Sequence, residues 1–399
     1  MQKFIALFLL TGIMVSAANA QQPEVYLFDA NRIASIQVSL KKGDVEIVKS
    51  VNWLLNEADK ILLLKPGSVM DKVFSPPSGN QHDYMSLAPY FWPDLTKPDS
   101  LPYIRKDGQR NPMINKITDK KNLVDLGRNT HLLGLAYAIT GKEIYATKAA
   151  DYLKTWFVAP ATKMNPNLTY AQAVLGVNDG RGIGIIETVS LSNVVDAMGL
   201  LQKSKALSIT DTQTITAWFD QYLNWMLTSK NGTDERHAKN NHGIWYDMQV
   251  LSFSLFLHKN EFARHYCDSI LKRIPVQVEP DGRLPLELER TTALGYSTFC
   301  LEAWFKTAIL ASRLGVDIWH YQTADGRGLQ KALDWLIPFA TGEKKWGYEQ
   351  IKEYTEVDKM YFLLMQASLR YHSAGYKTTA QKLGLRDVEL INLLYPGLE

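Results

Sequence analysis

The chain is poor in the residues that build metal sites and disulfide frameworks. It has two cysteines, Cys267 and Cys300, among 399 residues. It contains no cysteine cluster and no HExxH motif, and its eight histidines do not fall at short metal-ligand spacing. We therefore expect no catalytic metal and no cofactor. In an oxidising compartment the two cysteines are compatible with one disulfide and equally with two buried, unpaired thiols.

The chain also lacks a strong excess of charge of either sign. Its 44 basic residues stand against 41 acidic ones, a formal net charge of +3. Removal of an N-terminal segment that contains Lys3 leaves 43 against 41, or +2. So mild an excess does not mark a polyanion-binding protein, and we expect no nucleic-acid partner. A polyanionic ligand would need a local basic cleft.

Long apolar runs are absent except at the N-terminus. Lys3 gives a positive start, residues 4–15 an apolar core, and residues 18–20 a small-residue cleavage site, which together indicate a secretory signal over residues 1–20. The apolar core is too short to span a bilayer, and no cysteine follows the signal. We expect a periplasmic or secreted protein without membrane insertion, in which residues 21–399 form a single domain.

Helical spacing of apolar residues recurs along the chain. Residues 47–62 and 301–309 place them every three or four positions. Residues 210–213 predict a capping box at the start of another helix, and Gly141 and Gly375 indicate turns between paired helices. We count about twelve to fourteen helical segments and no strand pattern of comparable strength. This pattern predicts an all-α protein.

Residues 76–121 interrupt the helical pattern. Seven of the sixteen prolines fall there, with aromatic residues between them. A loop of this length in a compact domain is usually functional or disordered, and the aromatic residues make disorder the poorer choice. We predict that the segment forms a wall or lid of a groove. The alternative is that its aromatic residues only cap an apolar end of the fold.

Two short motifs indicate the chemistry. Asn241 and His242 are adjacent, and Arg290 and Tyr296 follow about fifty residues later. In a 4-linked uronic acid, removal of the C5 proton builds negative charge on the carboxylate, which an amide and an imidazole can stabilise. A phenol can exchange the proton if a nearby cation favours the phenolate. The motifs therefore predict β-elimination on an acidic polysaccharide.

Together with residues 82–94, 165–172 and 180–187, these motifs resemble the alginate lyase family with an α/α toroid fold. The resemblance covers roughly residues 80–370. It implies an all-α, incomplete (α/α) toroid of about six or seven helical hairpins whose inner helices frame a groove.

The resemblance also implies roles for the motif residues. Asn241 and His242 would neutralise and position the substrate carboxylate. Tyr296 would serve as acid and often as base, with Arg290 beside it. We also expect the Arg181 guanidinium to donate two hydrogen bonds to a carboxylate at a neighbouring subsite. With it, the predicted substrate-binding residues are His82, Tyr84, Tyr90, Gln172, Arg181, Trp245 and Tyr246.

The stereochemistry leaves two substrates and two bases open. In mannuronate and glucuronate the C5 hydrogen and O4 leave from the same face, so Tyr296 can handle both protons. In guluronate they lie on opposite faces, and His242 can be the base with Tyr296 as acid. We expect a lyase acting on alginate, with glucuronan as the alternative substrate.

Two other function classes compete with elimination. A toroidal glycoside hydrolase would need an Asp/Glu pair across the scissile bond. The available carboxylates show no spacing that singles out a pair: Asp83, Asp94, Asp179, Glu187 and Asp247. A noncatalytic glycan-binding protein would usually carry a lipidated cysteine after the signal, which is missing here.

Overall fold

The computed structural model describes residues 22–385 and 388–398, so the predicted secretory signal lies outside the described residues. Helices make up most of the described chain. The α-helices are α1 (Asn31–Lys42), α2 (Val45–Leu62), α3 (Asp119–Thr140), α4 (Glu143–Leu153), α5 (Leu191–Leu200), α6 (Ile209–Thr228), α7 (Lys230–Arg236), α8 (Asn241–Phe256), α9 (Asn260–Leu271), α10 (Ile274–Gln277), α11 (Pro285–Leu288), α12 (Ala293–Arg313), α13 (Leu329–Ala340), α14 (Val357–Arg370), α15 (Ala374–Lys382) and α16 (Glu389–Leu394).

Shorter elements lie between these helices. The 3-10 and π segments are η1 (Val69–Asp71), η2 (Pro112–Lys116), η3 (Lys154–Val158) and η4 (Gly182–Thr188). The strands are β1 (Met85–Leu87), β2 (Phe91–Trp92), β3 (Ile104–Arg105) and β4 (Tyr170–Ala173). β1 pairs with β4 in parallel, and β2 pairs with β3 antiparallel.

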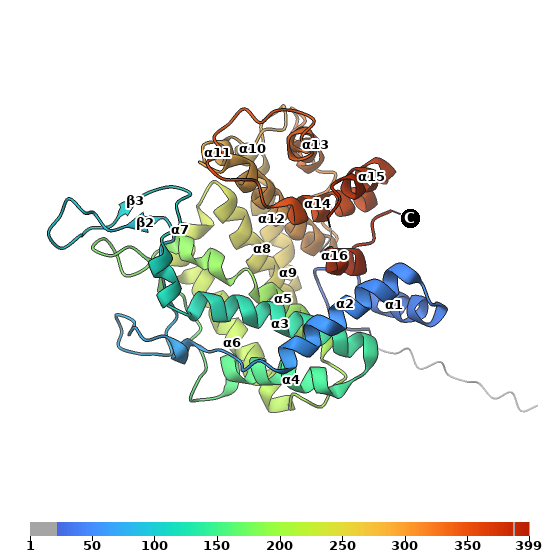
Figure 1. The fold of residues 1–399 in the computed structure, drawn as a ribbon, viewed down its shortest axis with the longest axis horizontal. Coiled ribbons are helices and arrows are strands. Elements are labelled where there is room, and N and C mark those ends of the chain that lie inside the picture. Colours follow the sequence, from blue (N-terminus) through green and yellow to red (C-terminus); the bar gives the residue numbers. More distant parts are fainter. Residues whose placement is uncertain (1–21, 386–387, 399) are drawn as a thin grey trace, which may run out of the picture.

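The helices close into a ring (Figure 1). Helices α3, α5, α8, α12 and α14 pack each against the next, and α4, α9, α13 and α15 pack against this inner set. At the end of the chain α16 packs against α2, which joins the last helices to the first. The predicted all-α toroid is confirmed.

The inner helices are buried on nearly every side. In α8, fourteen of the sixteen residues are buried, as expected for a helix that is largely apolar all round. The segment Gly182–Leu200 has the length and mean hydropathy, 1.3, of a membrane span, but 72% of it is buried inside the fold. Its apolar character thus serves the core of the ring.

One of the predicted helix ends is corrected by the structure. The residue that caps α6 is Ser208, two residues before the predicted box, because Ser208 accepts from the N–H of Asp211 and Asp211 accepts from the N–H of Ser208. Gly141 ends α3 in the left-handed conformation with φ of 72°, as predicted. The turn predicted around Gly375 lies at residues 371–373, between α14 and α15, and Gly375 itself is already inside α15.

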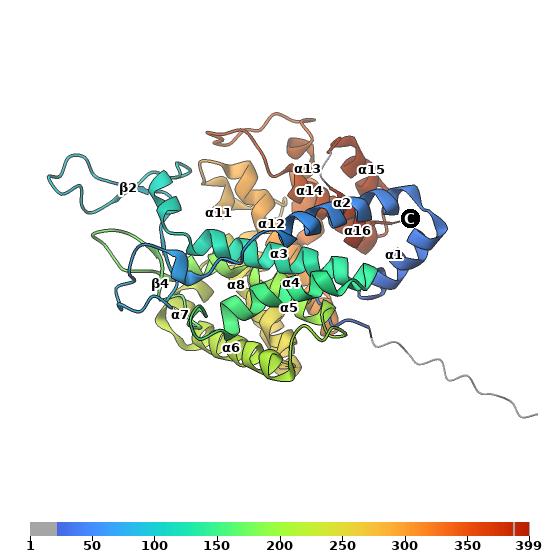
Figure 2. The ribbon, with the colours of Figure 1, turned by 60° about the horizontal axis from the view of Figure 1, so that its bottom comes forward.

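The segment 76–121 is not a featureless loop, because it contains β1, β2, β3 and η2. The β2–β3 hairpin extends from one end of the ring, and the C-terminus lies at the other end (Figures 1 and 2). Pairing of β1 with β4 brings Ser86 beside Gln172, whose backbone N–H donates to the Ser86 hydroxyl at 2.8 Å. Strand pairing therefore fixes the segment at that end of the ring.

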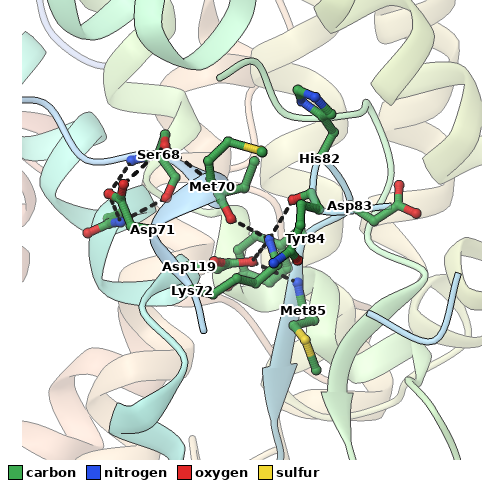
Figure 3. A network of polar contacts seen from close by, with 12 residues as sticks. Ser68, Met70, Asp71, Lys72, His82, Asp83, Tyr84, Met85 and Asp119 are labelled. Atoms are coloured by element: carbon green, nitrogen blue, oxygen red, sulfur yellow. Dashed lines mark hydrogen bonds and ion pairs between the residues drawn. The ribbon is translucent and has the colours of Figure 1, made fainter. Parts of the chain in front are cut away.

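A buried ion pair also fixes this segment (Figure 3). Lys72 Nζ lies 3.0 Å from Asp119 Oδ2, and both side chains are fully buried. Lys72 also donates to the carbonyl of Gln81 at 2.7 Å, and the N–H of Met85 donates to Asp119 at 3.0 Å. The pair thus joins the start of α3 to the chain on both sides of residues 76–81.

Candidate active site

A cavity of about 800 Å³ opens at the end of the ring that carries the strands. Its walls come from five separate parts of the chain: the β2–β3 hairpin, the start of α3, the region of β4 and η4, the start of α8, and the α11–α12 junction. The predicted residues that line it are Tyr90, Gln172, Arg181, Asn241, His242, Arg290 and Tyr296. The fold therefore brings together in one cavity residues more than two hundred positions apart.

Tyr296 lies in the first turn of α12 with its hydroxyl in a cluster of donors. The hydroxyl is 2.9 Å from the hydroxyl of Tyr90 and accepts from Arg290 Nη2 at 2.9 Å. The Arg290 guanidinium also lies over the Tyr296 ring, 3.7 Å from its centroid. Burial raises the pKa of Tyr296 above its usual value, more than the Arg290 charge lowers it. Arg290 favours the phenolate, as expected, but burial outweighs its charge, so the resting hydroxyl is protonated at neutral pH.

Asp107, at the base of the β2–β3 hairpin, holds Arg290 in place. Its carboxylate accepts from Arg290 Nε at 3.1 Å and from Nη2 at 2.8 Å. It also accepts from the backbone N–H and the hydroxyl of Thr291. Burial acts to raise the pKa of Asp107, but hydrogen bonds from Arg290 and Arg105 hold it well below the usual range. The hairpin and the Arg–Tyr pair are thus one connected unit.

His242 lies in the first turn of α8, where Asn240 caps the helix by accepting from the His242 N–H. Its Nδ1 is 2.8 Å from Oε1 of Glu235, a carboxylate whose side chain is fully buried. A histidine with Nδ1 held by a carboxylate presents Nε2 to its other side. Since His242 lines the cavity, Nε2 is the atom available to a substrate.

Asn241 is held by a second buried carboxylate, Glu287 of α11. The backbone N–H of Asn241 donates to Glu287 Oε1 at 2.6 Å, and its side-chain Nδ2 donates to Oε2 at 2.7 Å. An amide NH₂ has two hydrogens, so one donor remains for a ligand. Burial raises the pKa of Glu287, and the Asn241 hydrogen bonds oppose that rise.

The cavity is basic. Two carboxylates line it, Glu187 and Glu289, against five cationic side chains: Arg105, Lys120, Arg181, Lys239 and Arg290. This is the local cleft that a polyuronate requires, although the chain as a whole is nearly neutral.

Arg181 is positioned by backbone and side-chain contacts. It donates to the Gln172 carbonyl at 3.0 Å and to the Gln172 side chain at 3.1 Å, and it lies 4.9 Å from the Phe91 ring centroid. Gln172 itself has a positive φ of 50°. Burial lowers the pKa of Arg181 to about 10, so the group stays charged at neutral pH.

Four predicted substrate contacts do not line the cavity: His82, Tyr84, Trp245 and Tyr246. His82 turns away, with Nδ1 2.6 Å from the Lys163 carbonyl. Tyr246 is fully buried and donates to the Met226 carbonyl. Trp245 is 2% exposed and packs on Phe299. The cavity meets α8 only at its first turn, so residues one turn further lie in the core.

Tyr84, the fourth of these residues, contacts the cavity only through other side chains. It is fully buried, and its hydroxyl donates to Glu187 Oε2 at 2.9 Å. The Ser86 hydroxyl donates to the same oxygen at 2.5 Å, while Lys120 lies 3.0 Å from Oε1. Tyr84 and Ser86 therefore hold the carboxylate that positions Lys120 at the cavity.

The remaining polar candidates have structural partners. Among the hydrolase candidates, Glu187 alone lines the cavity. Asp83 accepts from Ser78 and Asn165, and Asp247 is paired with Arg273 in the interior. The two cysteines are buried, unpaired thiols, which is one of the two arrangements that the sequence left open.

Residues 68–346 match the family described as alginate lyase. A crystal structure of an alginate lyase from Bacteroides ovatus is 40% identical, with a TM-score of 0.90 over 94% of this chain and 100% of that chain. Alginate lyase A1-III from Sphingomonas species A1 is 16% identical, with a TM-score of 0.56 over 92% and 95%, which shows the fold alone. A His→Ala variant of A1-III complexed with a tetrasaccharide is 15% identical, with a TM-score of 0.58 over 95% and 98%. No curated protein matches the chain.

Proposed function

The chain belongs to the alginate lyase family, and from that premise we propose that it cleaves alginate by β-elimination in the cavity around Tyr296. It is a polysaccharide lyase. The observation that carries the proposal is the arrangement of four groups on one basic cavity. A phenol bonded to a guanidinium, an imidazole bonded to a carboxylate, and an amide donor are all present there.

His242 and Asn241 stabilise the substrate carboxylate in this proposal. Asn241 and His242 line the cavity from the same helical turn. As the C5 proton leaves, negative charge moves onto the carboxylate, and fixed donors stabilise that charge without having to reorganise. Glu287 and Glu235 hold the two donors in position.

Tyr296 transfers the protons when C5–H and O4 lie on the same face of the sugar. Its oxygen receives the C5 proton, and its own hydroxyl proton goes to the departing O4. The C4–O4 bond breaks as the C4–C5 double bond forms, and the tyrosine returns to its starting state. The two transfers are concerted, because a neutral phenol oxygen can accept the C5 proton only as its own proton moves to O4.

In guluronate the C5 proton lies on the opposite face, and His242 takes it instead. The imidazolium that forms is stabilised by Glu235, whose carboxylate is 2.8 Å from Nδ1. Tyr296 then donates its proton to O4. Asn241 donates to the substrate carboxylate in both routes, whereas His242 does so only in the first, so the substrate geometry decides which base acts.

Incubation with separate mannuronate blocks, guluronate blocks and glucuronan tests the proposal. Elimination creates a C4–C5 double bond that absorbs in the ultraviolet, whereas hydrolysis does not. We expect absorbance to rise with at least one alginate block. Cleavage without ultraviolet absorbance would contradict elimination, and activity on glucuronan alone would move the substrate away from alginate.

We also propose that residues 21–399 act as one domain outside the cytoplasm after removal of residues 1–20. The support is the sequence signal, and residues 1–21 lie outside the described part of the chain. The intact mass of the exported protein, which should begin at Gln21, tests the cleavage. A cytoplasmic product that retains Met1 would contradict it.

A further inference from the structure

A second cavity, of about 400 Å³, adjoins the first. The two cavities share Lys120 and Val124 in their walls, so the second lies directly beyond these two side chains; we call it the extension. The second cavity lies over the start of α3 and is lined by Ser86, Leu87, Arg110, Ile114, Asn115, Ile117, Thr118, Lys120, Lys121, Val124 and Asp125. None of the proposed catalytic residues reaches it.

The charges along this extension favour an anion. Three cations line it, Arg110, Lys120 and Lys121, against one carboxylate, Asp125. Lys121 is paired with Asp125 at the surface, and Lys120 is paired with Glu187 at the junction of the cavities. Arg110 is exposed, and within the described residues its side chain forms no hydrogen bond or ion pair. Its guanidinium is therefore available to a ligand.

The start of α3 adds to this charge. Residues 117–121 on the cavity wall include the first turn of a helix of 22 residues, whose N-terminal N–H groups carry a partial positive charge. Thr118 makes no side-chain cap to these N–H groups. The carboxylate of Asp119 is buried against Lys72, so it does not offset this charge in the extension.

We propose that this extension is a further binding site for uronate residues of the same polysaccharide chain, with Arg110 as the contact for a carboxylate. The inference rests on the proposed function. A polymer held at Tyr296 must continue beyond the catalytic cavity, and the extension past Lys120 offers the next carboxylate a planar, two-pronged donor. The enzyme therefore binds long chains more tightly than short ones.

The test compares Arg110→Ala with the matched control Arg264→Ala, an exposed arginine on α9 outside both cavities. Initial rates are measured on oligouronates of increasing length, from the shortest that the wild type cleaves up to polymer. One charge-assisted surface contact corresponds to a change in affinity of about two- to fivefold. We expect Arg110→Ala to raise KM for polymer by about that factor without lowering kcat, because the contact is made equally in the bound and transition states.

The effect should fade as the substrate shortens, and it should shrink as salt is added. Arg264→Ala should change neither value. An Arg110→Ala effect of equal size at every length, or no effect on polymer, would overturn the inference.

A binding measurement separates this inference from the proposed function. In the Tyr296→Phe background, the Kd for alginate polymer is measured with and without Arg110→Ala. We expect a roughly two- to fivefold weaker Kd. An unchanged Kd would overturn the extended site even if the enzyme cleaves alginate. A wild type that binds alginate through Arg110 but never forms the double bond would instead refute the proposed function.

Discussion

Replacement of Lys72 by methionine, with Asp119 retained, should destabilise the fold. Methionine keeps most of the side-chain length, but the Asp119 carboxylate is left where both side chains are fully buried. One oxygen of Asp119 already has no hydrogen-bond partner, and the other would keep the N–H of Met85. Removal of one partner of a buried ion pair typically costs about 3–5 kcal/mol, because the remaining charge is uncompensated.

This loss can be converted into a melting temperature. For a chain of this size the entropy of unfolding is roughly 0.8 kcal/mol/K. The free-energy loss then corresponds to a fall in Tm of about 4–6 °C, measured by circular dichroism on purified protein.

The loss should also depend on pH. Burial raises the pKa of Asp119 to about 7 even beside Lys72, and without the ammonium the pKa rises further. A carboxyl group whose pKa is higher in the folded state binds its proton more tightly there, so its stabilisation is present at low pH and is lost as the pH rises through the folded pKa. The deficit of Lys72→Met should therefore be small near about pH 5 and large near about pH 8.

The control is the double variant Lys72→Met/Asp119→Asn. Asparagine keeps an oxygen to accept the N–H of Met85 but carries no charge, so the double variant should recover most of the lost stability. A Tm of Lys72→Met within about one degree of wild type at every pH would refute the reasoning, as would a double variant no more stable than the single one.

Further predictions concern the catalytic cavity. Tyr296→Phe should lower kcat by about 10²- to 10⁴-fold with an unchanged melting curve, and a near wild-type rate would exclude the hydroxyl from the mechanism. His242→Ala and Asn241→Ala should each lower kcat by about 10²- to 10³-fold, whereas a change confined to KM would make the residue a uniform binding group. Asp107→Asn should lower kcat, because Arg290 loses the carboxylate that holds it beside Tyr296; an unchanged kcat would separate Asp107 from Tyr296. EDTA should leave the rate unchanged, and its inhibition with rescue by one divalent cation would reveal a metal.

The helices could be predicted because their signals are local. The apolar spacing of residues 301–309 falls within α12. Gly141 ends α3 because it adopts the left-handed backbone conformation, which glycine favours. The start of α6 was misplaced because two overlapping patterns fit a capping box. Ser208 caps the helix because Asp211 supplies a charged acceptor for its N–H.

The candidate site was only partly predictable. Asn241, His242, Arg290 and Tyr296 have chemistry that suits elimination, so the sequence alone suggested them. Asp107 could not be found this way, because it lies 183 residues from Arg290 and reaches it only through the hairpin.

Two further carboxylates had weak local signals. Glu287 lies three residues before Arg290, and Glu235 lies seven residues before His242. This spacing does not reveal their partners. Glu287, on α11, bonds to Asn241, on α8. Glu235 and His242 lie on α7 and α8, and the chain turns between these two helices. Trp245 and Tyr246 were placed at the substrate because the sequence does not show that they are buried. Only the folded ring shows that α8 is an inner helix.

The attachment of the β2–β3 hairpin through Asp107 has a consequence for how the enzyme tolerates variation. If opening of the hairpin costs about 3 kcal/mol, fewer than about one molecule in a hundred is open, and at about 1.4 kcal/mol roughly one in ten is open. Activity scales with the closed fraction. Substitutions on the hairpin that lower its opening free energy therefore reduce activity very little at first. We call the opening free energy the reserve: once it is small, one further substitution reduces activity strongly. Hydrogen exchange of the Lys106 amide, which donates to the Tyr90 carbonyl at 2.7 Å, measures that reserve directly. Variants that lose this protection without losing activity would show that the hairpin sets no such threshold.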